Sequence, residues 1–246
     1  MTTLKSTFRQ GQDSFLGAQP SMWYGDAVPD GDAYPWKDAA LGSTYVYQTS
    51  ALSICYQKQA TNDADADWVP GTWVGSTALD GSAAPFSTAP VGSVYHYVSS
   101  GITIKYTKMA DNDDSANWYG EGCIYNLGVA YDDLTDGGAA VGTLVMTADI
   151  PAGATATKSV VRNVVGWAGD TSAVLTIGDG TDADRYNTGT PSIFANAAIV
   201  DMGAVSGTAL HTSAVTTPTL TVTSGSDYGA VSAGSLDVYI YFNVVA

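Results

Sequence analysis

Residues 42–58, GSTYVYQTSALSICYQK, recur fifty positions later as residues 92–108, GSVYHYVSSGITIKYTK. The similarity extends to both sides, so that residues 23–68 align with residues 73–118 without a gap. The identical pairs in the flanks are Trp23/Trp73, Gly25/Gly75, Asp30/Asp80, Gly31/Gly81, Pro35/Pro85, Asn62/Asn112, Asp63/Asp113 and Trp68/Trp118. Ungapped self-similarity of this kind indicates the duplication of one folding unit.

Each copy is predicted to contain a β-hairpin. Residues 45–47 and 52–58 alternate large with small or polar side chains at a period of two, and residues 48–51 separate them as a turn. The large side chains of a copy can therefore share one face. They are Tyr45, Tyr47, Leu52, Ile54 and Tyr56 in the first copy and Tyr95, Tyr97, Ile102, Ile104 and Tyr106 in the second, with Trp68 and Trp118 expected to close over them.

The second half of the chain changes pattern after Cys123. Apolar runs at residues 144–148, 159–168, 173–177, 198–202, 219–222 and 237–244 are separated by turn clusters, which is typical of a β-sandwich or a jelly-roll-like domain. The sequence thus predicts an all-β chain. Its parts are an N-terminal arm (1–22), two β repeats (23–72 and 73–122), a Gly-rich connector (123–142) and a C-terminal β-sandwich-like domain (143–246).

The composition of the chain argues against several classes of function. The chain has 9 basic and 24 acidic residues, a formal charge of −15, and no basic patch that could neutralise nucleic-acid phosphates or an anionic membrane surface. No apolar run reaches the length that spans a bilayer, and the first residues lack the apolar core of a secretory signal, so we expect a soluble chain. The two cysteines, Cys55 and Cys123, are expected to be free thiols, because the repeat places Lys105 where Cys55 stands.

The small size of each repeat predicts assembly. One hairpin buries little apolar area and would be marginal by itself. Packing on the sister copy, on the C-terminal domain or on symmetry-related subunits would supply the missing burial, and we expect a homotrimer.

A family resemblance adds to this picture. Residues 160–165, VVRNVV, followed by residues 175–186, LTIGDGTDADRY, and an alternating last strand resemble the C-terminal β-domains of tailed-phage virion proteins, above all head decoration and head-fibre proteins. The hairpin from Gly42 to Trp68 is similar to short modules of phage fibres and adaptors. The resemblance implies a homotrimer on the surface of the virion capsid, bound to the major capsid protein and without catalytic residues.

The N-terminal arm carries the predicted capsid contacts. Its apolar and aromatic side chains can fill grooves between capsid subunits. These residues are Phe8, Phe15, Leu16, Met22 and Trp23. The alternative is a tail-fibre or adhesin-type module that binds host surface glycans; the absence of a long shaft segment favours the head.

Catalytic chemistry finds little support in the sequence. His96 replaces a strand valine, Val46, of the first copy, and His211 lies in a Thr/Ser-rich loop, so neither is expected to serve a hydrolytic triad. Glu121 is the sole glutamate, whereas a polysaccharide hydrolase needs paired carboxylates in a cleft. We therefore expect no enzymatic activity.

Two groups of residues are of a type that could bind a ligand. Acidic turns could collect oxygen ligands for Ca²⁺, but Asp side chains in such turns more often bond their own backbone, so no cofactor is expected. The weak calcium candidates are Asp63, Asp65, Asp67, Asp179, Asp182 and Asp184, with Asp111, Asp113 and Asp114 in the sister copy. Tyr45, Tyr47 and Trp68 could stack on sugar rings, although packing in the core of the hairpin is the simpler role.

Overall fold

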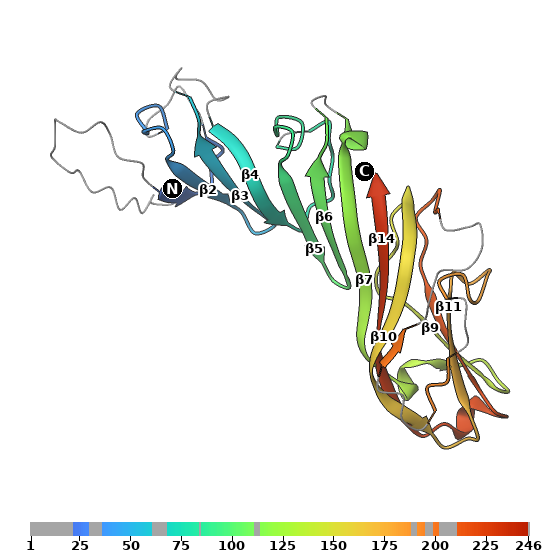
Figure 1. The fold of residues 1–246 in the computed structure, drawn as a ribbon. Coiled ribbons are helices and arrows are strands. Elements are labelled where there is room, and N and C mark those ends of the chain that lie inside the picture. Colours follow the sequence, from blue (N-terminus) through green and yellow to red (C-terminus); the bar gives the residue numbers. More distant parts are fainter. Residues whose placement is uncertain are drawn as a thin grey trace. The chain divides into compact units, whose positions relative to one another are not determined.

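The computed structural model describes residues 22–29, 36–60, 68–83, 85–110, 114–187, 191–194, 199–201 and 211–245 (Figure 1). Every element in these residues is a β-strand or a short 3-10 turn, which confirms the all-β prediction. Among them there is no helix long and apolar enough to cross a membrane. The chain divides into two compact units. Unit 1 is Met1–Val98 with Lys105–Tyr119, and unit 2 is Ser99–Ile104 with Gly120–Val245.

Six strands of the repeat region lie side by side in chain order. They are β1 (Met22–Gly25), β2 (Thr44–Gln48), β3 (Leu52–Lys58), β4 (Trp68–Gly75), β5 (Val94–Ser99) and β6 (Ile102–Lys108). The β2–β3 hairpin is antiparallel, with Tyr45 opposite Tyr56 and Tyr47 opposite Ile54. The hairpin predicted for the first copy is thus present with its predicted strands.

The two copies share strand β4. It pairs antiparallel with β3 along its whole length, and its last four residues also pair parallel with β5 on the other side, where Trp73 meets Tyr95. Strand β1 pairs with β2 in the same parallel register, in which Trp23 meets Tyr45. Strand β4 therefore closes the first copy and opens the second, and the predicted boundary after residue 72 falls inside it.

Parallel neighbours need a crossover connection, which is usually a helix. Here an irregular loop, residues 76–93 in the second copy, takes that place and contributes Phe86 to the core. Phe86 is 3% exposed and packs edge-on against Tyr95 and Trp73, at ring-centroid distances of 5.0 and 5.6 Å. In the first copy Trp36 holds the equivalent position, 5.7 Å from the ring of Tyr45. The loop thus covers one face of the sheet as a crossover helix would.

Strand side chains hold the crossover loop of each copy at two points, near its start and near its middle. The Tyr95 hydroxyl donates to the Thr77 carbonyl at 2.5 Å, and the Tyr45 hydroxyl donates to the Ala27 carbonyl at 2.6 Å. Near the middle of the second-copy loop, the Lys108 ammonium donates to the carbonyls of Phe86 (3.3 Å) and Ser87 (2.8 Å).

The first copy repeats the lysine contact. Lys58 Nζ donates to the Trp36 carbonyl at 3.0 Å and to the Lys37 carbonyl at 2.7 Å. Lys58 and Lys108 are each 1% exposed, which is rare for lysine and requires that the ammonium group be hydrogen-bonded. Each lysine therefore ties the crossover loop to the end of its hairpin.

The core of the repeat region is the predicted aromatic face. Tyr45, Ile54, Tyr56 and Trp68 are buried in the first copy, and the second copy buries Tyr95, Ile104, Tyr106 and Trp118. Tyr47 and Tyr97 are half-buried. The period-two alternation therefore identified the buried face.

Unit 2 contains two sheets (Figure 1). The strands of the first, in spatial order, are β7 (Trp118–Ala130, in this unit from Gly120), β14 (Ala233–Val245), β10 (Ala154–Ala168) and β12 (Ile199–Asp201). Those of the second are β11 (Ala173–Gly178), β13 (Thr219–Ser224), β9 (Val141–Val145) and β8 (Thr135–Asp136). The 3-10 turns of the chain are η2 (Ser115–Asn117), η3 (Tyr131–Asp133) and η4 (Tyr228–Ala230). A sandwich or jelly-roll strand arrangement stays a prediction.

Both sheets bury alternate side chains. Strand β14 buries Leu236, Val238, Ile240, Phe242 and Val244, and strands β11 and β13 bury Leu175, Ile177, Leu220 and Val222. Each of the six strands predicted for this half overlaps an observed strand. The predicted connector, residues 123–142, includes much of β7 and all of β8, which the sequence did not indicate.

Two glycines in the strands of unit 2 face aromatic rings. A Cβ atom at Gly122 of β7 would collide with the ring of Phe242, and one at Gly142 of β9 would collide with the ring of Tyr228. Glycine weakens a strand pattern in the sequence, yet it is the residue that lets a large ring lie against the backbone. At these two positions glycine therefore makes close packing possible.

We expect Lys108→Met to lower the free energy of unfolding by about 2 kcal/mol, because it leaves two buried carbonyls without a donor. Lys105→Met, an exposed lysine in the same strand, should change it by less than about 0.5 kcal/mol. Urea denaturation of both variants measures the difference. Equal midpoints for the two variants would contradict the tethering role.

We expect Gly122→Ala to destabilise the chain by about 1–3 kcal/mol through overpacking against Phe242. Gly71→Ala is the control, because a Cβ there would approach no atom closer than the Cys55 carbonyl at 3.9 Å. Adding Phe242→Leu to Gly122→Ala should cost less than the sum of the two single changes. Strict additivity in thermal unfolding would show that the ring does not require the glycine.

Candidate binding surfaces

The predicted capsid contacts fall at the N-terminal end of the chain. Phe8, Phe15 and Leu16 lie outside the described residues. Met22 and Trp23 belong to β1, where the backbone of Trp23 pairs with Tyr45 and corresponds to that of the buried Trp73. Met22 is 56% exposed, as is Tyr24 two positions on.

Strand β1 presents Met22 and Tyr24 away from the core. A Cβ at Gly25 would lie 2.5 Å from the buried Tyr45 hydroxyl, so Gly25 faces the core and the exposed Met22 and Tyr24 face outward. In register beside Tyr24 comes Val46 of β2, and beside Val46 comes Cys55 of β3. We call these outward residues, Met22, Tyr24, Val46 and Cys55, the copy-1 outer face.

The same positions in the second copy have different chemistry. The repeat equivalents of Met22, Tyr24, Val46 and Cys55 are Thr72, Val74, His96 and Lys105. Val74 pairs with His96 in the parallel register, as Tyr24 pairs with Val46. The scaffold is constant, but these four positions are uncharged in the first copy and include a cation and an imidazole in the second. The other outward residues of the β2–β3 hairpin are polar, namely Thr44, Gln48, Ser53 and Gln57. Aligning the two copies in the sequence shows these four differences, but only the strand pairing shows that the four residues share a face.

Cys55 and Cys123 are both free, as predicted. Cys55 is exposed on the copy-1 outer face. Cys123 is partly buried, and desolvation raises the pKa of its thiol to about 11, against a lowering by a backbone hydrogen bond and by the nearby Lys158.

The described acidic turn uses its carboxylates locally. Asp179 Oδ1 accepts hydrogen bonds from the backbone N–H groups of Thr181 (3.0 Å) and Asp182 (2.9 Å), and Asp179 Oδ2 forms an ion pair with Arg185. The Asp184 N–H donates to Asp182 Oδ1 at 3.4 Å. Among the described residues no group of three acidic, histidine or cysteine side chains is arranged to hold a metal ion. The candidates Asp63, Asp65 and Asp67 lie outside the described residues.

The aromatic residues considered for sugar stacking are mostly core residues. Tyr45 is fully buried and Trp68 is 3% exposed, so neither ring offers a free face. Their packing supports the simpler role considered for them. Tyr47 is half-buried.

The residues weighed for catalysis occupy separate elements. His96 is half-buried in β5, and His211 is exposed and bridges to Thr155. Glu121 is exposed in β7. The absence of enzymatic activity stays a prediction.

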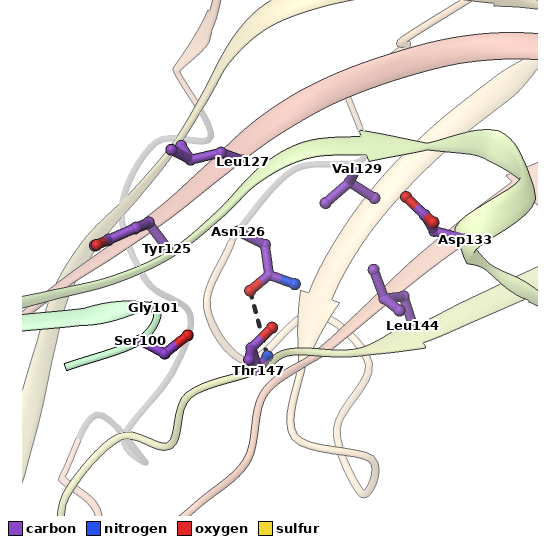
Figure 2. Close-up of a pocket in the computed structure, with 9 residues that line it drawn as sticks. All are labelled: Ser100, Gly101, Tyr125, Asn126, Leu127, Val129, Asp133, Leu144 and Thr147. Atoms are coloured by element: carbon purple, nitrogen blue, oxygen red, sulfur yellow. Dashed lines mark hydrogen bonds between the residues drawn. The ribbon is translucent and has the colours of Figure 1, made fainter.

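Unit 2 also has an open hollow of about 450 Å³ (Figure 2). Its lining residues are Ser100, Gly101, Tyr125, Asn126, Leu127, Val129, Asp133, Leu144 and Thr147. The Thr147 N–H donates to Asn126 Oδ1 at 3.3 Å, and Asp133 Oδ2 accepts from the Ala130 N–H at 2.8 Å. The lining thus offers one carboxylate that is already engaged and no nucleophile paired with a base.

Comparisons with known proteins add little to these observations. No protein-family model matches the chain, and no curated protein matches it. A solved structure described as a cyanophage Pam1 capsid asymmetric unit is similar over 48% of this chain and 86% of that chain, with 16% sequence identity and a TM-score of 0.27. A TM-score this low is below the range of chains that share a fold.

We expect one cysteine per chain to react rapidly with a thiol reagent at pH 8. At that pH a thiol of pKa about 11 is only about one-thousandth ionised, and the thiolate is the reactive form, so Cys123 should react slowly. Reaction with Ellman's reagent should lose its fast phase in Cys55→Ser and keep it in Cys123→Ser. A fast phase that survives in Cys55→Ser would contradict this assignment.

Proposed function

We propose that this chain is a structural accessory protein of a bacteriophage particle, which decorates the outside of the capsid and binds the major capsid protein through its N-terminal end. The observation that carries the proposal is the difference between the two copies. One scaffold presents the exposed apolar side chains of Met22 and Tyr24 next to the N-terminal arm in the sequence, whereas the repeat positions of the copy-1 outer face hold Thr72, Val74, His96 and Lys105.

Exposed apolar side chains of this kind suit a protein partner. Met22 and Tyr24 are each more than half exposed on the shortest strand of the repeat region. Exposed large apolar side chains that are grouped on one face mark interaction sites. The apolar side chains of the arm, Phe8, Phe15 and Leu16, precede this face directly in the sequence and would extend it.

The construction of the repeats suits a spacer. Shared strand β4 leaves no flexible linker between the copies, and the lysine tethers fix each crossover loop to its hairpin. A spacer between an attachment segment and a displayed unit is a structural role, in keeping with the resemblance to decoration and head-fibre proteins. The net charge of −15 would keep decorated particles apart.

Assembly as a homotrimer is part of this proposal. Three copies around one axis would bring three apolar arms to one capsid site, and multivalent attachment strengthens binding without new contacts. The alternative function is a tail-fibre or adhesin-type module that binds host glycans. Gold-labelled antibody on intact particles separates the two, since label over the head favours decoration and label at the tail favours the alternative.

We expect the double substitution Met22→Ser and Tyr24→Ser to weaken binding to capsids that lack this protein by at least about tenfold, because each apolar side chain buried at an interface is worth about 1.5–3 kcal/mol. Val74→Ser, at the repeat position of Tyr24, is the matched control and should change binding by less than about twofold. Co-sedimentation measures both. In bound protein, Cys55 should also be protected from thiol reagents.

A second set of variants tests the arm. Replacing Phe8, Phe15 and Leu16 together by serine should weaken binding further without changing the melting temperature. Full binding by this variant and by the Met22/Tyr24 variant would refute attachment through the N-terminal end.

A further inference from the structure

Strand β14 has a second face that the core does not use. Its buried residues alternate with Asp237, Tyr239, Tyr241 and Asn243, all of which are partly exposed. Figure 1 shows β14 flanked by β7 and β10, and residues of both strands lie beside these outward residues of β14.

Two cations and a third tyrosine flank the tyrosines of β14. Lys158 of β10 stands opposite Tyr241, and Arg162 stands opposite Asp237. Tyr125 of β7 packs against Tyr239 with a ring-centroid distance of 6.3 Å and an interplanar angle of 35°. We call Tyr125, Tyr239, Tyr241, Lys158 and Arg162 the tyrosine face.

The tyrosine rings are partly exposed and lie beside hydrogen-bonding groups. Lys158 Nζ lies 4.7 Å from the centre of the Tyr241 ring, in a cation–π position. Burial, followed by the negative charge of Asp237, raises the pKa of the Tyr239 hydroxyl, so this hydroxyl is neutral and can both donate and accept. Successive outward positions of a strand are about 6.6 Å apart, so Tyr239 and Tyr241 can meet neighbouring rings of one ligand.

A β-bulge fixes the polar end of the tyrosine face. Asn163 has a φ of +50°, and the β10–β14 register shifts between Arg162 and Val165. The bulge lets Asn163 Nδ2 donate to Asp237 Oδ2 at 2.6 Å, while the Gly128 N–H donates to Asp237 Oδ1 at 2.6 Å. A non-glycine residue with positive φ is uncommon, and bulges often re-aim side chains at binding sites. Asp237 is thereby occupied on both oxygens.

Charge singles out this face. Residues 120–245 contain twelve acidic residues and three basic ones, Lys158, Arg162 and Arg185. Arg185 forms the ion pair with Asp179, so the other two cations both stand on the tyrosine face. Where the structure describes side chains, the acidic residues near this face are Asp237, which is hydrogen-bonded, and the exposed Glu121 of β7. The backbone of Asp201 of β12 pairs with Val160, which stands opposite Tyr239. In a chain of charge −15, two cations beside partly exposed aromatic rings favour a ligand that has both flat rings and negative groups.

We propose that the tyrosine face binds a saccharide that bears acidic groups, with tyrosine rings against the sugar rings and with Lys158 and Arg162 on the carboxylates or phosphates. Tyrosine suits this ligand because its ring is apolar and its hydroxyl bonds to polar groups. The inference goes beyond the proposed function and does not depend on capsid attachment, since it concerns unit 2 and a different ligand.

Affinity electrophoresis of the full chain tests the proposal. Gels containing polygalacturonate (carboxylate) or a teichoic acid (phosphate) should retard the protein, whereas gels with neutral dextran or with polyglutamate, a polyanion without sugar rings, should not. Retardation by neither acidic saccharide, or equal retardation by polyglutamate, would overturn the proposal.

Matched variants identify the surface. Tyr241→Ala, and Lys158→Gln combined with Arg162→Gln, should each weaken retardation by at least about fivefold. The controls are Tyr24→Ala and Lys105→Gln, an exposed tyrosine and an exposed lysine outside the tyrosine face, and they should leave it unchanged. Thermal unfolding verifies that each variant is folded. Equal retardation of wild type and tyrosine-face variants would overturn the assignment, as would a change in oligomeric mass in those variants, which would make this face a subunit contact.

Discussion

The repeat region depends on a buried ammonium group that holds a crossover loop. Parallel strands such as β4 and β5 cannot be joined by a tight turn. The chain has one glutamate and nine lysine and arginine residues, so it has few of the charged residues that fill the exposed face of a helix. Instead, Lys108 at the end of the hairpin donates to two carbonyls of an irregular loop, and the Tyr95 hydroxyl donates to a carbonyl near the start of the same loop. With the loop fixed, Phe86 can complete an aromatic core that neither strand nor loop could form alone.

Fixing the core in this way leaves the outer face of the sheet free to vary. Buried positions of the two copies hold matching or similar residues, because tyrosine hydroxyls and lysine ammonium groups must reach defined carbonyls. Outward positions have no such partner and differ in kind, from Tyr24 and Cys55 in one copy to Val74 and Lys105 in the other. The chemistry that distinguishes the copies is therefore confined to the surface, which is where a structural protein meets its partners.

In unit 2, too, a closely packed core leaves the outward residues available for other contacts. Its core is built from alternating strands in which glycine makes room for aromatic rings, as at Gly122 against Phe242. Its outward residues on β14 and β10 form a tyrosine face with two cations, organised by the bulge at Asn163. The proposals for the two units thus concern separate surfaces, one with exposed apolar side chains and suited to a protein and the other aromatic and cationic and suited to an acidic glycan.

The sequence by itself determined the strand content, the duplication and the buried aromatic face, because period-two alternation and a fifty-residue offset are local properties. It also contained the match of Lys58 with Lys108, but not its meaning. Only the tertiary structure decided that the copies share β4, that the lysines are buried and that Gly122 lies in a strand, because each depends on contacts between residues distant in the chain. The grouping of Tyr125, Tyr239 and Lys158 is of the same kind: these residues come from three strands, and only strand pairing brings them to one face.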